Sequence, residues 1–139
     1  MKNSTADIRI WLFVSLLLLA PVAAQAVSPI ENISARTAAG LIQENLSNPD
    51  FIILDIRTPR EFDAGRIAGA VMLDFYSKTF VQDFQNLDRN NTYFIYCRSG
   101  NRSGQLMKAV GDLGFKKIYN LERGLVDWVG QGFELKSTK

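Results

Sequence analysis

The sequence predicts an α/β fold: a mostly parallel sheet with helices on both of its faces. Two observations lead to this prediction. Short continuous apolar runs, such as residues 51–54 and 93–96, are bounded by turn or charged residues, which is typical of strands buried on both faces. Segments with apolar residues at helical spacing alternate with these runs. Strands that alternate with helices favour a parallel sheet covered on both sides.

The first part of the chain is expected to hold one helix and one strand. Residues 27–33 are expected to form a short polar lead-in. Ser34 suits the N-cap of a helix, because apolar residues follow it near positions i, i+3 and i+4. The sequence Asn-Pro-Asp at 48–50 ends this helix, and the apolar run 51–54 is the first expected strand.

The middle of the chain continues the alternation. Thr58 is suited to cap a second helix, with Pro59 at the first helical position and Glu61 three residues after the cap. A short strand is expected over residues 70–73. A helix is expected over residues 79–87, with its large apolar side chains on one face.

Two more strands and two more helices follow. Residues 93–96 form the third expected strand, and residues 104–110 belong to the helix after it. Residues 117–119 form the fourth strand. Residues 125–129 form a short last helix, which Gly130 is expected to stop.

The N-terminus is expected to be an export signal. Lys2 and Arg9 precede a short apolar core over residues 10–20, and the small-x-small sequence ending at Ala26 suits cleavage. The apolar core is shorter than the roughly 20 residues that a membrane crossing needs. We therefore expect a signal peptide over 1–26, a single domain over 27–139, and a periplasmic protein, or a secreted one if the source is not Gram-negative.

The charge and composition of the chain indicate which kinds of partner it does not bind. The chain of 139 residues has a formal net charge of +2, and no basic run is interleaved with aromatic residues. We therefore expect no nucleic-acid partner, and no stable membrane association after signal cleavage.

The single cysteine, Cys97, lies between the third expected strand and a helix. A strand that turns into a helix directs successive backbone N–H groups at one point, where the helix N-terminus adds positive charge. These groups, with Arg98 and Arg102, should lower the pKa of the Cys97 thiol and attract a small anion. Asp55 and Asn120 also fall at strand ends, and such ends gather at one edge of a parallel sheet.

Other roles for the cysteine fit poorly. A structural cysteine would have apolar neighbours on both sides, whereas polar, glycine and cationic residues follow Cys97. With one cysteine and no histidine, an intrachain disulfide is excluded, and metal centres and histidine-assisted catalysis are not expected. No cofactor is expected.

Three motifs together resemble those of the single-domain rhodaneses, and in particular their exported periplasmic kind. The first runs from Asp55 to Ala70, the second is the cysteine loop, and the third runs from Gly114 to Trp128. The resemblance covers nearly all of the expected mature chain. It implies a rhodanese-like domain with a central sheet of about five strands.

The resemblance also implies a function: thiosulfate sulfurtransfer, with sulfane sulfur held on Cys97 as a persulfide and passed to cyanide or a thiol. Asp55, Arg57 and Glu61 are then an ion-pair set that supports the site. Thiosulfate would be bound by the rest of the loop, namely Arg98, Ser99, Gly100, Asn101, Arg102 and Ser103.

Two residues depart from the family pattern. Arg66 stands where histidine is common, and is expected to lie away from the sulfur. Arg123 stands where the first of two glycines is common. It is expected either to add charge for an anionic substrate or to be a solvated surface residue.

Two alternatives stay open. A cysteine phosphatase or arsenate reductase would have five residues between its cysteine and arginine, whereas four separate Cys97 from Arg102. A non-catalytic sulfur carrier, which delivers sulfur to a partner protein, needs the same loop and is not separated from an enzyme by sequence.

Overall fold

The computed structural model describes residues 28–111 and 113–138, and its architecture is the expected α/β fold. Five strands, all parallel, form one sheet in the order β1-β5-β4-β2-β3. The elements along the chain are β1 (Ile30–Ile33), α1 (Ala35–Glu44), β2 (Phe51–Asp55), α2 (Pro59–Ala64), β3 (Val71–Met72), α3 (Phe80–Gln85), β4 (Thr92–Tyr96), α4 (Asn101–Ala109), β5 (Lys117–Leu121) and α5 (Gly124–Gly130).

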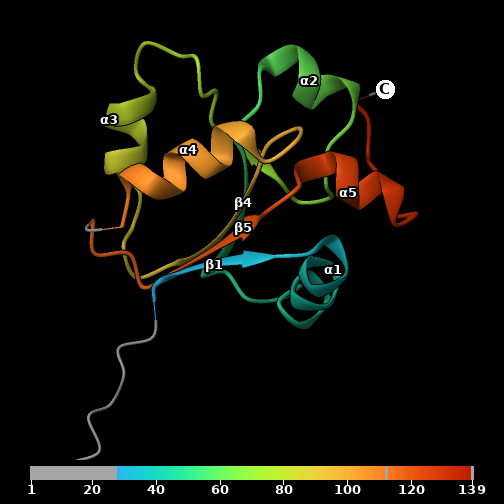
Figure 1. Cartoon of the computed structure of the whole chain (residues 1–139), viewed down its shortest axis with the longest axis horizontal. Coiled ribbons are helices and arrows are strands. Elements are labelled where there is room, and N and C mark those ends of the chain that lie inside the picture. The colour runs from blue at the N-terminus through green and yellow to red at the C-terminus, as the bar shows by residue number, and fades with distance from the viewer. Residues whose placement is uncertain (1–27, 112, 139) are drawn as a thin grey trace, which may run out of the picture.

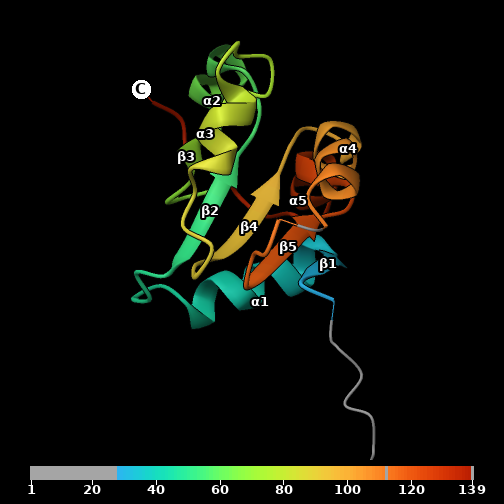
Figure 2. The same cartoon turned by 90° about the vertical axis from the view of Figure 1, so that its left-hand side faces the viewer.

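Helices cover both faces of the sheet, as expected. On one face α3 and α4 bury Phe80, Phe84 and Leu106 against the strands. On the other face α1 and α5 bury their apolar side chains, including Trp128. Figure 1 shows α3 and α4 on one side of the strands and α1 on the other, and Figure 2 shows the strands side by side. The helix α2 has no buried residue and lies at the end of the sheet.

The expected polar lead-in over residues 27–33 was wrong. Residues Ile30–Ile33 form β1, the edge strand that pairs with β5. Only Ile33 of this strand is fully buried, so its sequence lacks the apolar run that marks the central strands. Pairing with a distant strand, rather than local sequence, determines this element.

Helices α1 and α2 begin at the capping residues that the sequence predicts. The Ser34 side chain accepts a hydrogen bond from the Thr37 N–H, which confirms the cap of α1. Thr58 and Glu61 form the expected reciprocal capping box at α2, with Pro59 at its first position. Helix α4 begins at Asn101 rather than at 104, so part of the cysteine loop belongs to the first turn of the helix.

The C-terminal segment packs back onto the domain. Residues Arg66 and Lys136 pair through two backbone hydrogen bonds of 2.9 and 2.8 Å. The Trp128 indole donates to the Glu134 carbonyl and stacks against Phe133. This segment therefore supports the turn that follows α2.

The predicted export signal over 1–26 lies outside the described residues. Within the described part of the chain, no helix combines the length and apolar character that crossing a membrane requires.

A buried ion pair joins β2 to the turn after α2. The Arg57 guanidinium donates to both carboxylate oxygens of Asp55 and to the Gly65 carbonyl, at 2.7 to 3.1 Å. Burial alone would lower the pKa of Arg57, but the hydrogen bonds and charge of Asp55 raise it above its usual value. Asp55 is fully buried, so neither group is easily replaced.

Removing the Asp55 charge should destabilise the protein strongly. We expect Asp55→Asn to lower the free energy of unfolding by about 3 kcal/mol, because Arg57 is left buried without its counter-charge. Glu31→Gln is the control: it removes the exposed ion pair with Lys117 and should cost less than about 1 kcal/mol. Urea unfolding of both variants measures the difference, and equal losses would contradict this account.

Candidate active site

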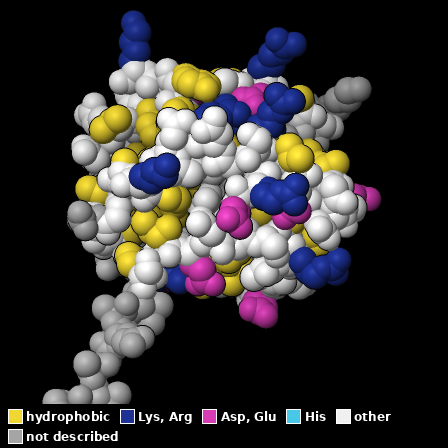
Figure 3. All heavy atoms as spheres, viewed as in Figure 1, with side chains coloured by type: hydrophobic (Ala, Val, Ile, Leu, Met, Phe, Trp, Pro, Cys, Tyr) yellow, Lys and Arg dark blue, Asp and Glu magenta, His cyan; other side chains and the backbone are white. Residues whose placement is uncertain are grey.

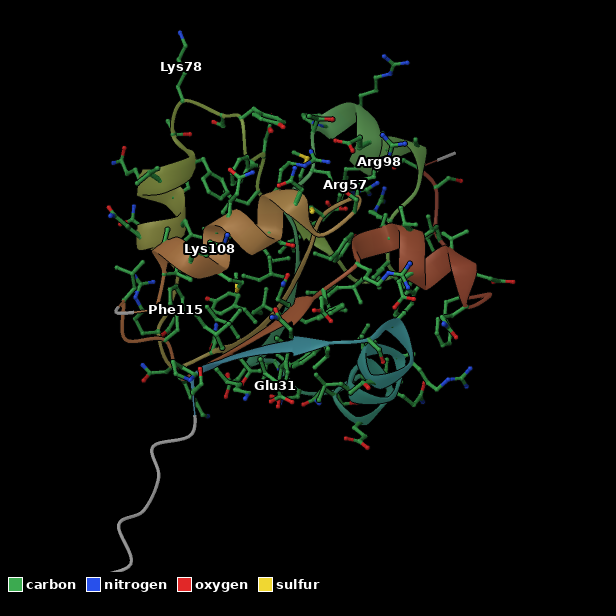
Figure 4. The ribbon with its side chains drawn as sticks, in the orientation of Figure 1. Glu31, Arg57, Lys78, Arg98, Lys108 and Phe115 are labelled. Atoms are coloured by element: carbon green, nitrogen blue, oxygen red, sulfur yellow. The ribbon has the colours of Figure 1, made fainter. Side chains whose placement is uncertain are left out.

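The cysteine loop lies at the carboxyl end of the sheet. Cys97 directly follows β4, and α4 begins four residues later at Asn101. In Figure 4 the labelled Arg57 and Arg98 lie in this region, beside the turn that leads into α4. This is the edge at which parallel α/β sheets bind ligands.

The Cys97 sulfur is buried and surrounded by hydrogen-bonding groups. The Gly100 N–H donates to Sγ at 3.2 Å. The Ser103 hydroxyl lies 3.6 Å from Sγ and also within 3.4 Å of the Gly100 carbonyl. Both Cys97 and Ser103 are at most 1 % exposed, so the loop itself supplies the polar surroundings of the sulfur.

These groups change the acidity of the thiol. Burial by itself would raise the pKa of Cys97, but hydrogen bonds from the Ser103 N–H and hydroxyl, and from the N–H groups of Ser99 and Gly100, lower it below the usual value. The largest lowering contributions therefore come from the loop backbone and Ser103. The expected backbone contribution is present, and Ser103, one of the two loop serines expected to donate to the loop or the sulfur, contributes through both its N–H and its hydroxyl.

Helix α5 holds the backbone of the cysteine loop in place. The N–H groups of Leu125 and Val126, in the first turn of this helix, donate to the carbonyls of Cys97 and Arg98 at 3.0 Å each. First-turn N–H groups have no partner within their own helix. The loop carbonyls satisfy these donors, and the same bonds leave the loop N–H groups free to face the sulfur.

Two glycines make this close approach possible. A Cβ on Gly100 (φ +87°) would lie 1.8 Å from the Glu122 carbonyl oxygen. A Cβ on Gly124 (φ +57°) would lie 2.5 Å from the Cys97 carbonyl oxygen. Backbone cannot yield as a flexible side chain can, so both positions require glycine.

The two arginines of the loop differ in their ion-pair partners and surroundings. Arg102 donates to both carboxylate oxygens of Glu61, at 2.8 Å each, and its guanidinium lies 5.6 Å from the centre of the Tyr76 ring. Arg98 is exposed and has no ion pair within the described residues. Arg98 is therefore the loop cation available to an incoming anion, whereas Arg102 already has a partner.

The expected ion-pair set of Asp55, Arg57 and Glu61 is found as two separate ion pairs. Asp55 and Arg57 pair with each other, as expected, but Glu61 pairs with Arg102 across the loop. This pair could not be predicted from the sequence, since its partners are 41 positions apart and give no local signal.

Of the other predicted loop residues, Ser99 and Asn101 are exposed, and the side-chain Oδ1 of Asn101 accepts a hydrogen bond from the Gln105 side-chain amide. Asn120 lies inside β5, buried on the face that carries α4, and its amide donates to Asn32. No hydrogen bond joins Asn120 to the sulfur within the described residues, so it does not form part of the thiol's surroundings.

The two unusual arginines lie outside the loop. Arg66 packs over the Phe62 ring, with 4.4 Å between its guanidinium carbon and the ring centre, and donates to Thr138. Arg66 therefore contacts α2 and the C-terminal segment. This agrees with the expectation that it lies away from the sulfur. Arg123 is exposed and lines a hollow beside α1 with Arg36 and Asp127.

The described residues contain no group of three or more His, Cys, Asp or Glu side chains placed to hold a metal ion. What the loop offers instead is a buried thiol of lowered pKa, inward-facing N–H groups and one exposed cation. This arrangement suits nucleophilic attack by sulfur on an anionic substrate.

The Glu61–Arg102 pair should make stability depend on pH. The hydrogen bonds of Arg102 lower the pKa of Glu61 from 4.5 to about 2, although burial opposes this shift. The pair therefore stabilises the fold above pH 4.5, and the contribution is lost as the pH falls toward 2. We expect Glu61→Gln to cost about 1–2 kcal/mol at pH 7, because the pair is partly exposed.

The measurement is urea unfolding of both proteins at several pH values. The difference between wild type and Glu61→Gln should shrink steadily below pH 4.5. A difference that stays constant with pH would show that the carboxylate charge is not what stabilises the loop.

Comparisons with known proteins agree with this geometry. The chain is 28 % identical over 102 residues to the thiosulfate sulfurtransferase GlpE of Tolumonas auensis, a match that covers 73 % of this chain and 91 % of the relative. It is 31 % identical over 103 residues to the GlpE protein of Pseudomonas entomophila, covering 73 % and 87 %.

Solved structures give the same result for the fold. A rhodanese-related protein from Thermoplasma volcanium superposes with a TM-score of 0.62 at 25 % identity, covering 76 % of this chain and 97 % of the other. The sequence model of the family described as rhodanese-like domain matches residues 38–131 of this chain. These residues include α2, the cysteine loop and α5. The chain therefore belongs to the rhodanese-like domain family.

Proposed function

We propose that this protein is a thiosulfate sulfurtransferase that carries sulfane sulfur on Cys97 as a persulfide and passes it to cyanide or to a thiol. The observation that carries the proposal is the buried Cys97 sulfur, which faces hydrogen-bond donors of the loop and has the exposed cation Arg98 beside it. Relatives named thiosulfate sulfurtransferase support the reaction class. The protein is a sulfurtransferase of the rhodanese type.

In the first step, the Cys97 thiolate attacks the outer sulfur of thiosulfate. A bond forms between Sγ and that sulfur, the S–S bond of thiosulfate breaks, and sulfite leaves with the bonding electron pair. The enzyme then holds a persulfide anion, whose charge the loop N–H groups stabilise as they stabilise the thiolate. The step uses no side-chain base, because the loop donors that lower the pKa of Cys97 favour its thiolate.

In the second step, cyanide or a thiolate attacks the outer sulfur of the persulfide. Cyanide leaves as thiocyanate, a thiolate leaves as a new persulfide, and the Cys97 thiolate is restored. Both donor and acceptor are small anions, which the exposed charge of Arg98 attracts. Arg102, held by Glu61, contributes to the positive field at the loop from a fixed position.

Phosphatase chemistry fits less well. With four residues between Cys97 and Arg102, and with Arg102 engaged by Glu61, the loop offers a smaller cradle and no free guanidinium for a phosphate held beside the sulfur.

The proposal includes export. The N-terminal sequence has a cationic start, a short apolar core and a small-x-small site ending at Ala26. We propose that the mature protein begins at Val27 and acts in the periplasm, where sulfur anions and small thiols would be its partners.

The acidity of Cys97 can be tested directly. The rate of alkylation by iodoacetamide should rise with a midpoint below the free-cysteine value of about 8.5. Ser103→Ala should move the midpoint upward, because it removes the hydroxyl nearest Sγ. Ser99→Ala is the control: it keeps the backbone N–H and should not move the midpoint. A wild-type midpoint at or above 8.5 would count against a stabilised thiolate.

Sulfur transfer can be tested by intact mass and turnover. Thiosulfate should add the mass of one sulfur atom to the protein, and cyanide should remove it as thiocyanate. Cys97→Ser should abolish the adduct and turnover, because a hydroxyl without a base is a poor nucleophile. Arg98→Ala should raise the thiosulfate KM roughly tenfold if Arg98 gathers the dianion, and Arg36→Ala, an exposed arginine on α1, should not.

Other outcomes would change the conclusion. An adduct without steady turnover would favour a sulfur carrier that delivers to a protein partner. Rapid hydrolysis of p-nitrophenyl phosphate without a sulfur adduct would overturn the proposal in favour of a phosphatase.

A further inference from the structure

A hollow between β1, β5 and α4 has no role in the proposed sulfur transfer. Its lining includes Asn32 of β1, Asn120 of β5, Gly104 and Lys108 of α4, and Glu122, which follows β5. Its volume of about 360 Å³ lies in the range of small-molecule sites, about 300–1,000 Å³. The hollow is therefore large enough for a small ligand.

The Asn120 side chain in this lining is buried and has an oxygen without a hydrogen-bond partner. Asn120 is only 3 % exposed, and its Nδ2 donates to Asn32 Oδ1 at 2.8 Å. Among the described residues, Asn120 Oδ1 is the one buried side-chain nitrogen or oxygen that has no partner. Leaving a buried polar atom unpaired is unfavourable, so this oxygen needs a donor that the described part of the chain does not supply.

Two exposed side chains of opposite charge also line the hollow. Neither Lys108 nor Glu122 forms an ion pair with another described residue. Figure 4 shows Lys108 on α4, and Figure 3 shows a basic and an acidic side chain on this face with uncharged surface between them. A ligand with one positive and one negative group matches this pair of charges.

A glycine of α4 keeps the hollow open. A Cβ on Gly104 would have no other atom within 4 Å. The backbone of Gly104 is helical and its φ is not positive, so its conformation does not require glycine. Glycine is unfavourable within a helix. The helix therefore gives no reason for a glycine here, whereas space for a ligand does.

We propose that this hollow binds a small zwitterion of the α-amino acid type. Its ammonium group donates to Asn120 Oδ1 and to the Glu122 carboxylate, and its own carboxylate accepts from Lys108. The ammonium group supplies the donor that Asn120 lacks. Cys97 takes no part in this site, so the inference does not depend on the sulfurtransferase activity.

The test is a titration of isotope-labelled protein with L-alanine, followed by NMR. The backbone amide of Gly104 and the side-chain amide of Asn120 should shift together and saturate with one Kd. Propionate lacks the ammonium group of L-alanine, and ethylamine lacks its carboxylate. Each should bind at least about tenfold more weakly, because each leaves one charged group of the hollow without a partner.

Two substitutions test the groups that would hold the ammonium. Asn120→Leu should raise the Kd for L-alanine at least about tenfold, because it removes the acceptor. This variant should still fold, since an apolar side chain of similar size replaces an amide that is incompletely paired. Glu122→Gln should also raise the Kd for L-alanine about tenfold, but should leave that for propionate within about twofold.

Gly104→Leu tests the location of the ligand, with Gly40→Leu as its matched control. The leucine at 104 should fill the hollow and abolish the binding of L-alanine. Gly40 lies in α1, its Cβ would also have no atom within 4 Å, and it does not line the hollow. Gly40→Leu should therefore keep the wild-type Kd within about twofold.

Three outcomes would overturn the proposal. The first is the absence of a saturable shift with L-alanine in the wild type, which would mean that only solvent meets the Asn120 oxygen. The second is equal affinity for L-alanine and propionate, and the third is equal binding by wild type and Gly104→Leu. Cys97→Ser should bind L-alanine as the wild type does, so a failure of this site and a failure of sulfur transfer are distinguishable.

Discussion

The backbone contact between the cysteine loop and the first turn of α5 is the constraint on which the site depends. Two hydrogen bonds of 3.0 Å draw the carbonyls of Cys97 and Arg98 onto α5. A Cβ at Gly100 or Gly124 would clash with backbone atoms there. Because the carbonyls face α5, the N–H groups of the loop are left to face the sulfur. The acidity of the thiol is therefore a consequence of how two segments of backbone pack, and not of a nearby base.

Ion pairs determine which arginine near the cysteine loop is available to a ligand. The buried Asp55–Arg57 pair holds the end of β2 to the turn after α2, and Glu61 then reaches Arg102 from α2. These pairs give two of the three arginines around the loop a carboxylate partner and fix their positions. Arg98, which is exposed, stays available to a ligand. A site that binds and releases small anions needs both kinds of arginine. An arginine with a carboxylate partner stabilises the structure of the loop, whereas an arginine without one can bind and release a ligand.

Most of the fold could be predicted from the sequence, because its signals are local. Continuous apolar runs mark β2 and β4, and the capping residues Ser34 and Thr58 mark the starts of α1 and α2. Strand β1 could not be predicted, since only Ile33 is buried and its pairing partner is β5, far along the chain. The same limit applied to the site. The loop was recognised from its own residues, whereas the Glu61–Arg102 pair and the support from α5 depend on contacts between distant segments.

The groups that surround the sulfur differ from the surface beside the loop. The loop's backbone N–H groups and Ser103 surround the sulfur and suit the sulfur atom that is transferred, so they carry no information about the rest of the donor or acceptor. That information must come from surfaces that the rest of the molecule touches as it departs. An apolar groove between α2 and α5, with Arg98 among its lining residues, lies next to the loop. Because the C-terminal segment supplies Leu135 and is held by its pairing with Arg66, changes in that segment can alter the groove without altering the thiolate. The groups that surround the sulfur and the residues that line this groove thus belong largely to different parts of the chain, so one set can change while the other is kept.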